Sequence, residues 1–407
     1  MATYAARTES VFRSSDFRRY YAGQALSYLG DGLRTLAIPL LVFHITGSAA
    51  SLGLTFALEL LPFALFSLVG GSLADRIDRR RLMLGCDAVR FAIMALFVLA
   101  LWRGWLTLPL LYVGVVLLSI CAAVFLGAQT SSIPYLMGKD RAKAAVSALV
   151  ATEQGVNLIA PPLGGAIFGI VGALPALAIN ALTYLTSQIS IASVETFGPE
   201  RPGGFPKLRE IAGDVRAGFA FVFGDPTMRA LTLNSTVLNT VGIFGFVAII
   251  PYLKHEFGAT DVAVGIAFGA FALGSVTGSL VAGRTHWPLG PALIVAYACD
   301  GLCWMPTIWT HSMFVAVGAV TCCSAFGAYQ MTSIVGWRMR VIPEDMVGRV
   351  FGVCRLLVVI GMFPGSILGG LMADAYGPRY VMALSGIAFL VLTFALVTSR
   401  AVREERR

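Results

Sequence analysis

Four acidic residues of this chain lie inside long apolar stretches, where an ionised carboxylate is costly. They are Asp31, Glu59, Glu153 and Asp300. Removal from water disfavours the charged form of a carboxylate, so such a group can exchange a proton near neutral pH. Ionisable groups in apolar segments commonly mark proton or substrate pathways. The chemistry we expect is therefore reversible proton binding or contact with a polar part of a substrate.

Two acids have an arginine three residues later. Arg34 follows Asp31, and Arg90 follows Asp87. Side chains three apart on a helix lie on one face, so each pair can meet. The pairing either keeps these acids ionised in a structural role or leaves Asp31 available for coupling, and the sequence leaves both alternatives open.

The other three acids, Glu59, Glu153 and Asp300, have no basic neighbour within one helical turn. That difference favours them as proton carriers. A distant helix could still supply Arg355 or Arg90 as a partner. For each of the three acids, the alternative to proton transfer or substrate binding is a structural role in which the carboxyl group is hydrogen-bonded. Among the three we favour Glu59, because it lies near the middle of its apolar stretch.

The elements that position these groups are long apolar segments. Hydrophobic residues make up 57% of the 407 positions and charged residues 13%, which excludes an ordinary water-soluble globule. Segments of about 20 apolar residues are long enough to cross a bilayer as helices. Twelve are expected, at 20–42, 49–73, 82–101, 107–130, 144–171, 174–194, 229–252, 261–282, 289–309, 312–336, 347–373 and 379–399. The expected fold is an all-α integral membrane protein.

The one long polar segment divides the chain. It covers 195–228, and its part 208–216 mixes apolar and charged residues at helical spacing, as in a helix at the membrane surface. We therefore expect a six-helix bundle over 1–194, a cytoplasmic linker over 195–228, and a second six-helix bundle over 229–407.

An internal repeat supports this division. The fifth apolar segment contains Ala160-Pro161-Pro162-Leu163-Gly164-Gly165, and the eleventh contains Pro364-Gly365-Ser366-Ile367-Leu368-Gly369-Gly370. Gly71-Ser72-Leu73 likewise recurs as Gly278-Ser279-Leu280. Parallel repeats of this kind occur in transporters built from two halves.

The basic residues predict the orientation. Of 30 Lys and Arg residues, 24 fall on the side shared by both termini and the linker, and only Arg103, Lys254 and Arg379 fall on the opposite side. This asymmetry places both termini in the cytoplasm. It also accounts for the net charge of +8 without a nucleic-acid partner. The first 19 residues do not resemble a cleaved signal peptide. Four lysines against 26 arginines suggest a GC-rich bacterial genome, and we expect a multi-pass protein of the bacterial cytoplasmic (inner) membrane.

No cofactor or metal site is expected. The seven cysteines form no Cys-x-x-Cys pair, and the four histidines are separated from one another. The sequence also contains no Gly-rich loop followed by Lys-Ser or Lys-Thr, which argues against an ATP-driven pump. A proton gradient is the energy source that we expect.

The segment from Gly70 to Arg81 resembles the signature loop between the second and third spans of major facilitator superfamily transporters. The resemblance implies two six-helix bundles that alternate access to a central cavity. It also implies a gating loop in which the acid at Asp75 interacts with the N-terminal end of the eleventh span and Gly71 permits the close approach. Arg76, Arg79 and Arg80 complete the loop, and anchoring on the positive-inside side is the alternative reading for the basic cluster.

The stretch 155–165 resembles the fifth-span motif of drug:proton antiporters. Pro161 and Pro162 remove backbone donors, and Gly164 and Gly165 permit the close approach of a neighbouring helix. The motif favours export, and a packing kink without influence on direction is the alternative.

The stretches 16–24 and 27–32, Pro62 and an Ile133-Pro134 turn expected after the fourth span narrow the resemblance. Together they are similar to the branch that contains enterobactin-type siderophore exporters and macrolide efflux proteins. This resemblance implies a secondary transporter, not an enzyme, that exports a small amphipathic organic compound such as a drug, antibiotic or siderophore in exchange for protons, and a link to multidrug resistance. We expect a monomer whose partners are substrate, protons and membrane lipids. The alternatives are a proton symporter or lysophospholipid facilitator on the same fold, and a non-transporting membrane sensor.

Overall fold

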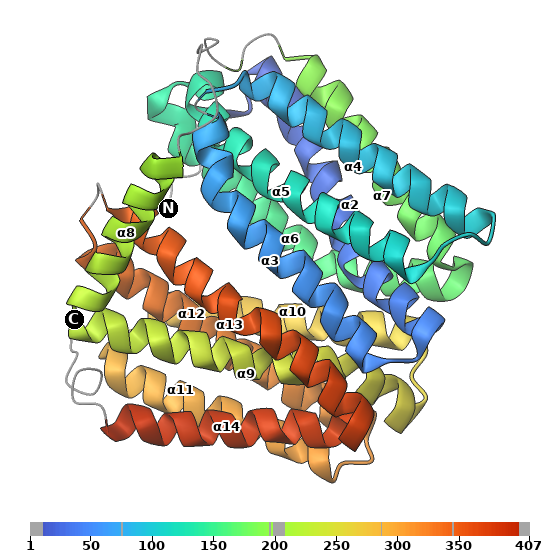
Figure 1. Ribbon diagram of the computed structural model, residues 1–407, viewed down its shortest axis with the longest axis vertical. Coiled ribbons are helices and arrows are strands. Elements are labelled where there is room, and N and C mark those ends of the chain that lie inside the picture. The colour runs from blue at the N-terminus through green and yellow to red at the C-terminus, as the bar shows by residue number, and fades with distance from the viewer. Residues whose placement is uncertain are drawn as a thin grey trace. The chain divides into compact units, whose positions relative to one another are not determined.

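The chain is all-helical in the residues that the structure describes. The computed structural model describes 11–74, 76–194, 197, 208–285, 287–343 and 346–398, without the side chains of 68, 69, 71, 72, 74, 139 and 208–211. Its helices are shown in Figure 1. They are α2 (Ser15–Thr46), α3 (Ala49–Ala74), α4 (Arg79–Trp102), α5 (Leu108–Met137), α6 (Lys139–Val171), α7 (Ala173–Ala192), α8 (Leu208–Gly224), α9 (Pro226–Phe257), α10 (Asp261–Arg284), α11 (Leu289–Trp304), η1 (Met305–Ile308), α12 (Met313–Val341), α13 (Val347–Tyr376) and α14 (Pro378–Thr398).

Each of the twelve expected apolar ranges corresponds to a helix. Within the described residues, eleven helices are long and apolar enough to cross a membrane. The range 174–194 forms α7, whose 20 residues span about 30 Å. Its buried polar residues, among them Asn180 and Ser187, lower its apolarity. The all-α expectation is therefore confirmed.

One local expectation is wrong. A turn was expected at Ile133-Pro134, but α5 continues through Pro134 and ends at Met137. The next residue, Gly138, has a φ of 75°, a value that favours glycine, and so supplies the turn itself.

Contacts divide the chain into two units. Unit 1 comprises Met1–Leu41 and Pro62–Ile211, and unit 2 comprises Val42–Leu61 and Ala212–Arg407. The end of α2 and the first half of α3 thus cluster with unit 2. The division into six-helix halves with a cytoplasmic linker stays a prediction.

The two units repeat their helix neighbours. In unit 1, α4 packs against α7 and α5, and α6 packs against α7. In unit 2, α11 packs against α14 and α12, and α13 packs against α14. Helices α4, α5, α6 and α7 of unit 1 therefore have the same neighbours within their unit as α11, α12, α13 and α14 have within unit 2.

Small residues allow two of these contacts. A Cβ added to Gly278 of α10 would lie 1.9 Å from the carbonyl oxygen of Ala325 in α12. A Cβ added to Gly70 of α3 would lie 2.8 Å from the carbonyl oxygen of Ala123 in α5. Both separations are too short for a side chain, so glycine is required for the backbones to pack this closely.

A side chain of the preceding turn caps the N-terminus of α4. The Asp78 carboxylate accepts hydrogen bonds from the backbone N–H groups of Arg80, at 2.8 Å, and Arg81, at 3.2 Å, and so caps α4.

The helix expected near 208–216 is present as α8. In unit 2, Asp214 of α8 lies 2.8 Å from the Nε of Arg349 in α13.

Candidate functional site

A chain of buried amide and hydroxyl groups joins three helices of unit 1. Gln24 of α2 donates to the Ser187 hydroxyl of α7 at 3.0 Å. The side-chain amide of Gln129 in α5 donates to the side-chain oxygen Oε1 of Gln24 at 3.0 Å and to the Tyr28 hydroxyl at 3.1 Å. Gln24 is 1% exposed and Gln129 is 5% exposed. The partners satisfy these amides and fix the inner faces of α2, α5 and α7.

Two ion pairs lie beside this chain of hydrogen bonds. The Arg34 Nε lies 3.7 Å from the Asp31 carboxylate, and the Arg90 Nη1 lies 3.3 Å from that of Asp87. Tyr184 of α7 also donates its hydroxyl hydrogen to Asp31. The local pairing expected for both acids is confirmed. Asp87 and Arg90 are fully buried, whereas Asp31 and Arg34 are half-buried.

Arg90 connects the two pairs through aromatic rings. Its guanidinium carbon lies 4.8 Å from the ring centroid of Phe125 in α5 and 5.4 Å from that of Tyr184. Ring faces stabilise a cation that has been removed from water. The same tyrosine therefore contacts Arg90 through its ring and Asp31 through its hydroxyl.

Some buried polar atoms of this cluster lack a partner among the described residues. They are both amide atoms of Asn180 and one carboxylate oxygen of Asp87. A buried polar group left without a hydrogen bond costs about 1–3 kcal/mol. The cluster thus retains hydrogen-bonding capacity that the described residues do not use.

Glu153 lies on α6, which packs along α2, the helix of Asp31. The hydroxyls of Tyr21 and Thr152 share a hydrogen bond, which fixes this part of α6 against α2. Glu153 is half-buried. In the described part of the chain, no cation forms an ion pair with Glu153.

The double-proline motif lies farther along α6. The helix continues through Pro161 and Pro162 as far as Val171, and Gly164 and Gly165 are buried. A Cβ on Gly164 would lie 3.2 Å from the carbonyl oxygen of Leu33 in α2. The expected close approach of a neighbouring helix is confirmed for Gly164.

The remaining candidates belong to unit 2. Asp300 of α11 is 3% exposed and accepts a hydrogen bond of 3.1 Å from the Gln330 amide of α12. Glu59 is half-buried in α3, and Arg355 is exposed on α13. Arg90, the other cation considered for these acids, pairs with Asp87.

The expected gating loop is described in part. Asp75 lies outside the described residues, Gly71 lies in the last turns of α3, and Arg76 is half-buried in the turn that follows. Arg79 is buried, with its guanidinium carbon 4.5 Å from the Tyr135 ring centroid. Arg80 donates from Nη2 to the carbonyl oxygen of Ala192 at the end of α7.

Unit 2 contains a contact between a carboxylate and a helix N-terminus, which is the kind of contact that the sequence predicts for Asp75. Asp374 in the last turn of α13 accepts hydrogen bonds from the Ser48 hydroxyl at 2.6 Å and from the backbone N–H groups of Ala49, at 2.7 Å, and Ala50, at 3.0 Å. A carboxylate at a helix N-terminus is favoured by the unpaired N–H groups and the helix dipole. Asp374 therefore caps α3 from another helix.

An ion-pair cluster also joins the end of α2 to α9 and α10 in unit 2. One carboxylate oxygen of Asp261 lies 2.6 Å from Lys254 Nζ and 3.0 Å from His44 Nε2. The Asp261 and Lys254 side chains are largely shielded, whereas the His44 side chain is 46% exposed. Protonated His44 strengthens this contact, because it then faces the carboxylate as a cation.

Sequence reasoning missed Tyr184 and Ser187 of α7. Asn180, Tyr184 and Ser187 are spaced by four and three positions, a pattern that places them on one helix face. That spacing was a usable signal for a polar face on α7. Asp374 gave no comparable signal, because its partners at the start of α3 are far away in the sequence. Lys254 and Asp261 are only seven residues apart, but they lie on different helices, so helical spacing does not predict their contact.

The chain is similar to known membrane transporters along nearly its whole length. Residues 6–406 match the family model described as transmembrane secretion effector, MFS_3. The enterobactin exporter EntS of Escherichia coli O6:K15:H31 is 22% identical over 406 residues, which covers 94% of this chain and 91% of the relative. Macrolide efflux protein A of Streptococcus pyogenes is 25% identical over 401 residues, which covers 94% of each chain.

Solved structures share the fold at low sequence identity. A mutant form of the nucleoside transporter NupG aligns with a TM-score of 0.75 at 13% identity, over 94% of this chain and 99% of that one. A bacterial homologue of the iron transporter ferroportin, in an inward-facing state, aligns with a TM-score of 0.74 at 15% identity and with the same coverage. The expected fold is confirmed, and the matched proteins are transporters and not enzymes. The chain belongs to the transmembrane secretion effector family of major facilitator superfamily transporters.

Proposed function

We propose that this transporter exports a small amphipathic organic compound in exchange for protons. It lies in a bacterial inner membrane with both termini in the cytoplasm. The observation that carries the proposal is the buried cluster of unit 1, in which Arg34 and the Tyr184 hydroxyl hold Asp31. The half-buried Glu153 lies on α6, the helix that packs along α2.

This arrangement suits exchange. When Glu153 is ionised, it and Asp31 repel each other, and a proton on Glu153 removes the repulsion. A substrate that places a donor or a cationic group between the two acids removes it in the same way. Proton and substrate then compete for one place, which is the requirement for antiport.

Glu59 and Asp300 remain alternative coupling residues in unit 2. Glu59 is the acid favoured by its position in the sequence, and Asp300 is fully buried with Gln330 as its amide donor. Glu153 is the stronger candidate, because it belongs to the same unit as the ion-paired Asp31 and forms no ion pair with a described cation.

The direction and substrate class rest on the relatives. Both curated relatives reported above are exporters by name, of enterobactin and of macrolides. The lining of the unit 1 cluster by Tyr28, Phe125 and Tyr184, with amides between them, suits amphipathic organic molecules better than sugars, whose many hydroxyls each need a partner.

Alternating access requires that contacts at each end of the protein form and break. We assign the contact of Asp374 with the start of α3, and that of Asp261 with His44 and Lys254, to the state closed toward the outside. Gly71, Asp75, Arg76, Arg79 and Arg80 would act at the opposite, cytoplasmic end.

Efflux from cells tests the proposal. Cells that lack their own exporters and produce this protein should accumulate less of a macrolide or a catechol siderophore than cells that produce Asp31→Asn. A proton uncoupler should abolish the difference. Higher accumulation in cells that produce the wild type would indicate import. If both kinds of cell accumulate the macrolide equally, and also the siderophore equally, the proposal is contradicted.

A further inference from the structure

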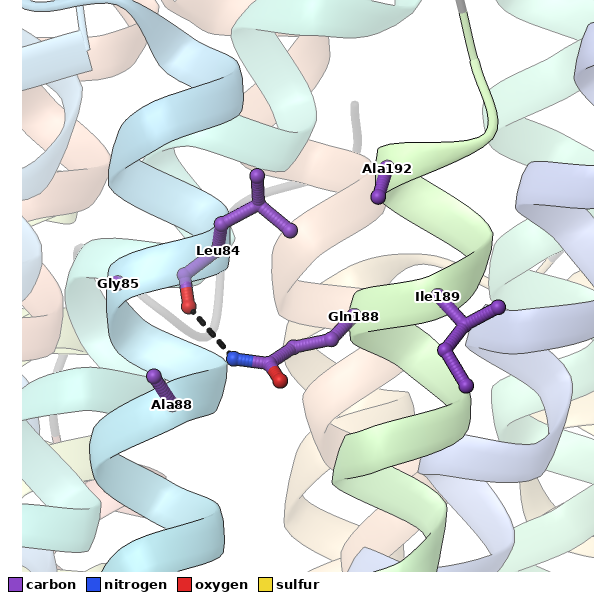
Figure 2. Close-up of a pocket in the computed structure, with 6 residues that line it drawn as sticks. All are labelled: Leu84, Gly85, Ala88, Gln188, Ile189 and Ala192. Atoms are coloured by element: carbon purple, nitrogen blue, oxygen red, sulfur yellow. Dashed lines mark hydrogen bonds between the residues drawn. The ribbon is translucent and has the colours of Figure 1, made fainter.

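An apolar groove runs between α4 and α7 on the outer face of unit 1. It is lined by Leu84, Gly85, Ala88, Gln188, Ile189 and Ala192 (Figure 2). Gly85, Ala88 and Ala192 are exposed, and Ile189 is 62% exposed. These small residues leave the space, because a Cβ added to Gly85 would meet no atom within 4 Å.

A single polar side chain lies across the groove. Gln188 donates from Nε2 to the Leu84 carbonyl oxygen at 3.1 Å, as Figure 2 shows. This bond uses one of the two N–H groups of the amide and leaves its oxygen available. Such an amide suits the ester region of a lipid, where apolar chain and polar headgroup meet.

Arginines gather at one end of the groove. Arg80 donates to the carbonyl oxygen of Ala192, and Arg19 donates to that of Ser193 at 3.3 Å. Arg80 stands one helical turn before Leu84, about 6 Å along α4. The carbonyl groups at the end of α7 carry only partial negative charge, so two full positive charges remain beside the groove.

We propose that this groove binds one acyl chain of an anionic phospholipid, whose phosphate lies against Arg19 and Arg80. Charge complementarity selects this occupant, because an apolar channel that begins one turn from two cations matches the order of phosphate, ester and chain in such a lipid. Basic sites between helices at the cytoplasmic side of a membrane bind anionic headgroups in the same way. The lipid would cover the exposed backbone of α4 at Gly85.

Native mass spectrometry of the full chain, released from bilayers of mixed phosphatidylglycerol and phosphatidylethanolamine, tests the proposal. The wild type should retain phosphatidylglycerol in preference. Arg19→Gln and Arg80→Gln should each weaken that retention, by about fivefold per arginine. Arg284→Gln removes an exposed charge from unit 2 and serves as the matched control.

A second variant tests the acyl chain separately from the charge. Gly85→Leu fills the groove without a clash and should lower retention although both arginines are present. Gly318→Leu adds the same side chain at another open, exposed helix position and should have no effect. Equal retention of the two lipids, equal behaviour of the two leucine variants, displacement of the lipid by inorganic phosphate, or a protein dimer lost on Gly85→Leu would each overturn the proposal.

Discussion

At the scale of single residues, the cost of burying charge explains how the unit 1 cluster is built. Asp87 and Arg90 are both fully buried, and each would be costly alone. Their ion pair, together with the rings of Phe125 and Tyr184, replaces the water that both lost. Removing one member should therefore harm the protein more than removing both.

The first prediction is a thermal-unfolding comparison in detergent. Arg90→Met leaves the Asp87 charge unpaired and should destabilise the protein by about 3–5 kcal/mol. The double variant Asp87→Asn, Arg90→Met should recover part of that loss. Arg103→Met, at an exposed position, is the control. A double variant as unstable as the sum of its single changes would refute the pairing.

The second prediction concerns Tyr184. Tyr184→Phe keeps the ring beside Arg90 and removes only the hydrogen bond to Asp31, and hydrogen bonds to charged groups contribute about 1.5–3 kcal/mol. Transport at low substrate concentration should fall about tenfold or more, with normal expression. Tyr380→Phe, at an exposed position, should behave as wild type. Normal transport by Tyr184→Phe would remove the tyrosine from the site.

These residues also show what the sequence could predict. The pairs Asp31–Arg34 and Asp87–Arg90 follow from a spacing of three within one helix. The contact of Tyr184 with Asp31 joins residues 153 positions apart, and no local pattern encodes it.

At the scale of helices, close backbone contact depends on glycine. Gly278 lies against the Ala325 backbone, and Gly164 lies against that of Leu33. The sequence predicted the spans well, because apolar length is a strong signal. It predicted a turn at Pro134 wrongly, because a proline can also be accommodated inside a membrane helix.

The third prediction uses two glycines of α10. Gly278→Ala places its Cβ 1.9 Å from a carbonyl oxygen and should destabilise the protein by about 1–3 kcal/mol. Gly283→Ala meets no atom within 4 Å and should be neutral or stabilising by up to about 1 kcal/mol. Detergent melting curves measure both, and similar melting temperatures would contradict the packing of α10 on α12.

At the scale of the whole molecule, the proposed transport cycle requires a closed outer end that can open. Asp374 caps α3 in addition to Ser48, whose hydroxyl accepts a hydrogen bond of 3.2 Å from the backbone N–H of Ser51. Loss of an N-terminal cap costs about 1 kcal/mol, which is about fivefold in a two-state equilibrium.

The fourth prediction follows from that cap. In a chain without native cysteines, Asp374→Ala should increase the labelling of Ser51→Cys by an impermeant maleimide added to intact cells. Asp214→Ala breaks an exposed ion pair at the other end of α13 and should leave the labelling unchanged. If Asp374→Ala labels no faster than Asp214→Ala, the carboxylate does not hold the outer end closed.

Proton movement in inverted membrane vesicles tests the central claim most directly. Respiration acidifies the lumen of these vesicles, and a pH-sensitive dye reports the release of protons when substrate is added outside. The account predicts that the wild type releases protons as substrate enters, whereas Glu153→Gln releases none and still exchanges labelled for unlabelled substrate. Substrate uptake by the wild type without proton release, or proton release that persists in Glu153→Gln, would contradict it. Loss of release in Glu59→Gln or Asp300→Asn instead would assign the coupling to that acid.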